Sequence, residues 1–217
     1  MTTHPASDGH PPSPVQWAAV DAWASEPAEA QAARARLEAE GASAPSRAQC
    51  AALRLFASLA GAQDALLLGT TGGVAENWIL EGMPAEGTLT VIDADPHRQA
   101  LTREALRDAP STAARVITAR AADVLPRLAD AGYDLVIVDD AAAVAGDLEQ
   151  APRLLRPGGT MVVRLGDHEG SRPLRDVAAS VREDSRWTAS WLTVGEGLLV
   201  AAWHGEDVAN ETDVSAI

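Results

Sequence analysis

The chain has 217 residues, 47% of them hydrophobic, which suffices for one α/β domain with a helical extension and its own core. Its 31 acidic residues outnumber 17 basic ones, and the net charge of −14 argues against nucleic acid or an anionic membrane as partner. A single cysteine, Cys50, excludes an intramolecular disulfide, and no apolar run has the length of a membrane span, so we expect a cytoplasmic protein. All 17 basic residues are arginine, which excludes lysine as a catalytic base.

The ends of the chain differ in composition from its middle. Residues 1–14 are rich in Pro, Ser, Thr and Gly, and residues 206–217 are similar, so we expect two flexible tails. Residues 15–205 are then one domain, with N-terminal helices over 15–60 and an α/β core over 61–205. Loosely helical spacing predicts a helical lid or docking element between about Val15 and Glu40. Ser46 is placed to cap a second helix, whose apolar positions are Leu53, Leu55, Phe56 and Leu59.

A short apolar run followed by a glycine-rich turn is the most informative pattern in the chain. Residues 64–68 indicate a buried parallel strand, residues 69–73 the turn, and residues 74–80 a helix. Backbone N–H groups at such a turn are expected to face an anionic group, and the glycines allow a ligand to approach closely. The next apolar run ends at Asp93, where the hydroxyls of a ribose would lie. Turn, strand and acid together predict a nucleotide-type cofactor site.

Strands and helices then alternate, as in βαβ units, which predicts a mostly parallel sheet covered on both faces. The last two strands flank residues 195–197 and indicate an antiparallel hairpin, which separates this chain from a dinucleotide dehydrogenase. We expect strands at 91–92, 115–118, 134–138, 160–163, 191–194 and 198–202, helices at 96–106 and 123–131, and a turn at 154–159 that closes a further helix.

This series of motifs resembles the class I S-adenosylmethionine-dependent methyltransferases, and among them the catechol and caffeoyl-CoA type of small-molecule O-methyltransferase. The match runs from about Ala33 to Ala202. The residues that carry it are 44–46, 68–73, 90–93, 122–126, 133–139, 154–159 and 195–198. The resemblance implies a doubly wound, mostly parallel seven-stranded Rossmann-like sheet that ends in an antiparallel hairpin, a small-molecule methyl acceptor and a homodimer.

The resemblance also implies S-adenosylmethionine as cofactor and assigns residues to it. Asp93 with Ala94 would bind the ribose, and Ala121 would lie beside the adenine. Asp139 is also assigned to the cofactor site. The residues implied around the methionine part are Gly69, Thr71, Gly73 and Ala75.

The chain departs from this family at the metal site. Metal-dependent members end the fourth strand in Asp-Ala-Asp-Lys and follow the fifth with Asp-Asn, whereas this chain has Asp139-Asp140 without a lysine and then Arg164-Leu165. It also has Leu67 where the family has an acid. A hard cation needs several oxygen ligands, so we expect no metal. Arg164 is hypothesised to pair with Asp139 and present positive charge to the acceptor; the alternative is that it points to solvent.

Several alternatives stay open at this point. Asp93 and Asp139 could instead cap the helices that follow them. Asp167 and His168 either supply ligands or a base through a loop shift or are solvated loop residues. The favoured function is a metal-independent methyltransferase in which Asp139 and Arg164 are the candidate catalytic residues. The alternatives are a cofactor-binding regulator without catalysis and a nicotinamide-dependent oxidoreductase.

Overall fold

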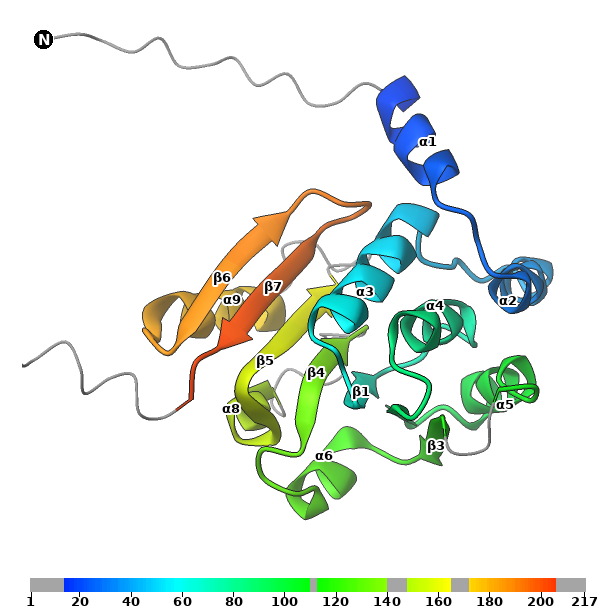
Figure 1. Cartoon of the computed structure of the whole chain (residues 1–217). Helices are drawn as coiled ribbons and strands as arrows, with labels where there is room; N and C mark the ends of the chain where they lie inside the picture. The colour runs from blue at the N-terminus through cyan, green and yellow to red at the C-terminus, as the bar shows by residue number, and fades with distance from the viewer. Residues whose placement is uncertain (1–13, 110–112, 140–147, 165–171, 206–217) are drawn as a thin grey trace, which may run out of the picture.

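The computed structural model describes residues 14–109, 113–139, 148–164 and 172–205. Seven strands form one sheet in the order β3-β2-β1-β4-β5-β7-β6 (Figure 1). The first five strands pair in parallel, and β7 is antiparallel to both β5 and β6. The strands are β1 (Asp64–Leu68), β2 (Thr88–Asp93), β3 (Ala114–Thr118), β4 (Tyr133–Val138), β5 (Leu155–Arg164), β6 (Trp187–Leu192) and β7 (Leu198–Trp203). The predicted doubly wound sheet with a terminal hairpin is confirmed.

Helices lie on both faces of the sheet, with α3 in front of it and α9 behind β6 and β7 in Figure 1. The helices are α1 (Pro14–Trp23), α2 (Ala28–Ala39), α3 (Arg47–Leu59), α4 (Val74–Gly82), α5 (Pro96–Ala105), α6 (Ala121–Val124), α8 (Ala151–Leu154) and α9 (Arg172–Glu183), with 3-10 turns at Leu125–Arg127 and Leu148–Gln150. Each helix in the described ranges is too short or too polar to span a membrane.

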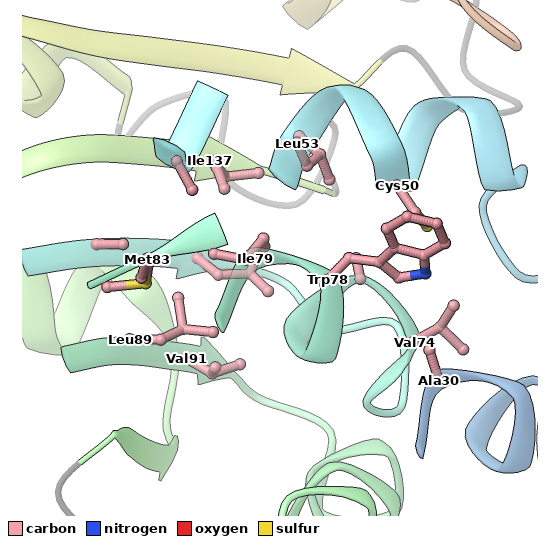
Figure 2. Close-up of a cluster of buried hydrophobic side chains, with 14 of the residues drawn as sticks. Ala30, Cys50, Leu53, Val74, Trp78, Ile79, Met83, Leu89, Val91 and Ile137 are labelled. Carbon is pink, nitrogen blue, oxygen red and sulfur yellow. The ribbon is translucent and has the colours of Figure 1, made fainter. Parts of the chain in front are cut away.

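Two buried clusters form the core, one on each face of the sheet. Because successive side chains of a strand point to opposite faces, Leu67 of β1 joins the cluster beneath α2 to α5, and Leu66 joins the one beneath α8 and α9. Figure 2 shows the first cluster, in which Trp78 of α4 lies beside Cys50 of α3. Cys50 is fully buried. Central strands buried on both faces explain their uninterrupted apolar sequences.

Some element boundaries differ from the prediction. The N-terminal helical segment is two helices, since α1 ends at Trp23 and α2 begins at Ala28. Pro27 separates them and is the N-cap residue of α2. The helix expected over 123–131 shortens to α6 and a 3-10 turn, with Pro126 inside the turn. Leu55 and Leu59 of α3 are exposed, so its buried face is narrower than expected. Ser46 caps α3 as predicted, since its hydroxyl accepts from the Gln49 N–H.

The turn expected at 154–159 is an irregularity inside β5. Tyr133 pairs with Leu155 but Leu135 pairs with Thr160, so the ladder accommodates extra residues there. Helix α9 was not predicted, although Val177 and Val181, four positions apart, both lie in the core. The two proposed tails lie almost wholly outside the described residues, and the domain bounds stay predictions.

Candidate functional site

The carboxyl ends of β1, β2, β4 and β5 meet at one edge of the sheet, where ligands of open α/β folds bind. The Gly69 N–H donates to the Ile92 carbonyl oxygen of β2 at 2.9 Å, and the Asp139 N–H donates to the Leu68 carbonyl oxygen of β1 at 2.8 Å. These bonds bring the glycine-rich turn, Asp93 and Asp139 to neighbouring positions.

Glu76 organises the glycine-rich turn from within. Its side chain is fully buried and accepts hydrogen bonds from the N–H groups of Thr71 and Gly73, both at 3.1 Å, and from the Thr71 hydroxyl at 2.6 Å. The Thr70 hydroxyl contacts the same carboxylate and also Thr102 of α5. Burial raises the pKa of Glu76, and the threonine hydrogen bonds oppose that shift. Our sequence analysis missed this residue, although an acid three positions after Gly73 fits a capping box.

The N–H groups of residues 71 to 75 are hydrogen-bonded within the turn, so these groups do not face an anionic group as expected. Besides the two bonds to Glu76, the Gly72 N–H donates to the Thr70 hydroxyl and the Ala75 N–H to the Thr71 hydroxyl. The Val74 N–H donates to the Thr71 carbonyl oxygen. Since the turn satisfies these donors itself, they stabilise the turn rather than bind a ligand.

Glycine is required at position 73 of this turn. Gly73 has φ +99°, and a Cβ there would lie 2.1 Å from the Ala105 Cβ of α5. Ala75 is fully buried in the core beneath the turn. The tight packing of α4 and α5 against the turn fixes the path of the backbone where the cofactor is expected.

Asp93 ends β2 with its carboxylate almost buried, at 8% exposure. Asp95, and not Asp93, caps α5: its carboxylate accepts from the N–H groups of His97 and Arg98. Asp93 instead accepts from the Asp95 N–H through Oδ1 at 2.7 Å, and its Oδ2 lies 3.5 Å from the Arg98 guanidinium. A carboxylate with two oxygens has acceptor capacity beyond these contacts, which fits a pair of ribose hydroxyls.

The other two residues assigned to the nucleoside follow the neighbouring strands β2 and β3. Ala94 is exposed directly after Asp93, and Ala121 is partly buried at the start of α6, which follows β3.

Arg164, the last residue of β5, pairs with Asp139 at the end of β4. The Arg164 Nε lies 2.5 Å from the Asp139 Oδ1, and the two side chains are only 14% and 8% exposed. Burial alone would lower the pKa of Arg164, but the charge and hydrogen bond of Asp139 raise it, so the guanidinium stays charged. Its Nη1 lies 3.9 Å from a Glu196 carboxylate oxygen at the hairpin tip. The hypothesised pair therefore forms, and Arg164 does not point freely into solvent.

Within the described ranges, no cluster of three or more His, Cys, Asp or Glu side chains could hold a metal ion. Asp140, Asp167 and His168 lie outside those ranges.

Comparison with known proteins identifies the family. A methyltransferase domain model matches residues 66–163, which include the glycine-rich turn, Asp93 and Asp139. A putative O-methyltransferase of Mycobacteroides abscessus is 40% identical over 185 residues, covering 78% of this chain and 86% of the relative. The chain belongs to this O-methyltransferase family. A probable O-methyltransferase of Mycobacterium tuberculosis is 37% identical over 223 residues, covering 93% of this chain and 99% of the relative.

Solved structures share the fold of this O-methyltransferase. The O-methyltransferase TomG of Streptomyces achromogenes, involved in tomaymycin synthesis and solved with S-adenosylmethionine, has a TM-score of 0.76 at 25% identity, covering 88% of this chain and 98% of that one. An O-methyltransferase of Bacillus cereus solved with S-adenosylhomocysteine has a TM-score of 0.74 at 23% identity, covering 86% and 98%. S-adenosylmethionine is the cofactor of this O-methyltransferase, and the acceptor capacity of Asp93 fits its ribose.

Proposed function

We propose that this S-adenosylmethionine-dependent O-methyltransferase acts on a small molecule without a divalent cation, and that Arg164 takes the place of that cation. The buried Arg164–Asp139 pair carries this proposal. A guanidinium held 2.5 Å from the carboxylate at the end of β4 occupies the carboxylate oxygen that a metal would need.

The proposed cofactor residues follow the edge of the sheet. Asp93 with Ala94 would hold the ribose hydroxyls, Ala121 would border the adenine, and Asp139 would close the site. When bound, S-adenosylmethionine supplies an electrophilic methyl group on a sulfonium. The residues proposed to surround its methionine part are Gly69, Thr71, Gly73 and Ala75, whose backbone path Glu76 fixes.

The proposed catalytic role of Arg164 is electrostatic. Its charge is fixed beside Asp139 before any acceptor arrives, so it needs little reorganisation to favour an anionic acceptor or a developing oxyanion. The chain contains no lysine to act as base. Alignment of an acidic acceptor oxygen with the methyl group would then supply much of the rate enhancement.

Turnover with and without chelator tests this proposal. Methyl transfer from S-adenosylmethionine to a panel of phenols should be the same in EDTA and in millimolar Mg²⁺. Arg164→Met should lower kcat and leave S-adenosylhomocysteine affinity nearly unchanged. Activity that disappears in EDTA and returns with Mg²⁺ would contradict the role given to Arg164. Cofactor binding without turnover of any acceptor would favour a regulator that has lost catalysis.

We also propose that the protein is a homodimer that does not bind nucleic acid. Large apolar side chains are exposed on α1 and α3, among them Trp23 at 82%, Leu59 at 74% and Leu55 at 54%, and such a patch is typical of an interface. The net charge of −14 opposes phosphate-backbone contacts. Light scattering should give twice the chain mass, and Trp23→Ser should shift the protein toward monomer; a monomeric parent protein would contradict this proposal.

A further inference from the structure

The Gln49 side chain is a buried amide without a partner. It lies on the first turn of α3 and is fully buried, and neither its Nε2 nor its Oε1 has a hydrogen-bond partner among the described residues. Buried side-chain amides are nearly always hydrogen-bonded, because removing them from water without compensation is unfavourable. Arg36, Trp78 and Gln99 each have one such unpaired atom, whereas Gln49 has both polar atoms of its side chain unpaired among the described residues.

Gln49 lies against the tip of the β6–β7 hairpin, which reaches the start of α3 in Figure 1. A Cβ on Gly195 would lie 2.6 Å from the Gln49 Cγ and Cδ, so the tip accommodates this side chain only because residue 195 is glycine. The next residue, Glu196, contacts Arg164 at 3.9 Å. Hence Gln49 borders the same hairpin tip from which Glu196 contacts Arg164.

The strand register also brings the hairpin tip to the carboxyl end of β5. Arg164, the last residue of β5, pairs with Leu198, the first residue of β7, and the hairpin tip comes just before Leu198 in the chain. Because Gln49 lies against Gly195 of that tip, it lies near the carboxyl edge of the sheet that holds Arg164.

Gln99 shows how a structural glutamine of this fold differs. It too is fully buried and its Oε1 also has no partner among the described residues, but its Nε2 donates to the Ile117 carbonyl oxygen at 2.9 Å and so links α5 to β3. Gln49 makes no such bond to a neighbouring element among the described residues. The two residues therefore form a matched pair, one with a visible structural bond and one without.

We propose that Gln49 is an acceptor-binding residue whose amide hydrogen-bonds a hydroxyl or carboxamide group of the methyl acceptor, away from the oxygen that is methylated. The inference rests on the proposed function, because it assumes that the acceptor lies beside Arg164. An amide offers both a donor and an acceptor, so it selects a neutral polar substituent, while the charge of Arg164 serves the reacting oxygen. Gln49 would then set specificity, since an acceptor without that substituent leaves the amide unpaired.

The test compares Gln49→Leu with Gln99→Leu. Calorimetry would measure binding of 3-hydroxybenzamide and of 3-methylphenol to protein saturated with S-adenosylhomocysteine. The parent protein should bind the benzamide more tightly, and Gln49→Leu should weaken its binding about tenfold, as expected for one lost hydrogen bond, without affecting 3-methylphenol. The Tm of Gln49→Leu should equal or exceed that of the parent, because the substitution removes an unpaired amide. Gln99→Leu should lower Tm and keep the preference of the parent protein for the benzamide over 3-methylphenol.

A lower Tm of Gln49→Leu with unchanged benzamide binding would show a structural amide and overturn the inference. Equal affinity of the parent protein for both phenols would overturn the ligand class. Because the readout is binding, these failures are distinct from failure of the proposed function, which appears as loss of turnover or as dependence on Mg²⁺.

Discussion

Breaking the Arg164–Asp139 pair should cost more stability than breaking any exposed ion pair of this protein. At 2.5 Å and an effective dielectric constant of about 20, the attraction is roughly 7 kcal/mol, most of which offsets the desolvation of two nearly buried charges. Arg164→Met preserves the length of the side chain but leaves Asp139 buried and unpaired. We expect the free energy of unfolding to fall by about 3–5 kcal/mol.

The matched control is Arg156→Met. Arg156 bridges Asp64 at 2.9 Å and Asp134 at 2.6 Å, but its side chain is 39% exposed. Solvent screening limits such pairs, so we expect a loss of about 1 kcal/mol. The contrast therefore isolates burial, since both arginines make short carboxylate contacts.

Urea unfolding of Arg164→Met, Asp139→Asn and the double variant provides the assay. The double variant should recover most of the loss of Arg164→Met, because it leaves no buried charge without a partner. The reasoning is refuted if Arg164→Met costs no more than Arg156→Met, or if Asp139→Asn adds its own loss in full.

Three further outcomes follow from the described contacts. Asp93→Ala should weaken S-adenosylhomocysteine binding roughly 10- to 150-fold in calorimetry, whereas Asp95→Ala should lower Tm and leave that affinity unchanged; equal effects would contradict the ribose assignment. Burial raises the pKa of Cys50 to about 12, so iodoacetamide at pH 8 should label it only as fast as the protein unfolds, and rapid labelling of native protein would oppose this. A hydrogen bond to Glu40 raises the pKa of His97, so this contact stabilises the fold below the unfolded pKa of about 6.5 and is lost as pH rises through the folded pKa. The Tm difference between the parent and Glu40→Gln should therefore be largest near pH 6 and vanish near pH 9; a constant difference would contradict it.

The sequence alone predicted the central strands and the terminal hairpin, because short stretches of sequence determine both. The apolar runs of β1 and β4 predicted buried strands because both faces of a central strand are covered, and the terminal hairpin followed from its glycines. The irregularity in β5 was not predictable, because it depends on how residues 156–159 pair with β4. Pro126 lies inside the helix expected over 123–131 and could have indicated that the helix ends early, as it does at Val124.

The candidate site likewise contains residues that the sequence predicted and residues that it did not. Strand ends placed Asp93 and the Arg164–Asp139 pair, since parallel strands bring their carboxyl ends to one edge. Glu76 was missed although its partners Thr70, Thr71 and Gly73 are close in sequence, because the acid three positions after Gly73 was not recognised as part of a capping box. The position of Gln49 was hidden for another reason, since it depends on contact with Gly195 at the far end of the chain.

A crystal structure with S-adenosylhomocysteine, grown in millimolar Mg²⁺, would show whether Arg164 takes the place of the cation. We expect the ribose hydroxyls on Asp93 and the Arg164 guanidinium still on Asp139, with no ion between them. An octahedral ion coordinated by Asp139, with Arg164 displaced, would contradict it.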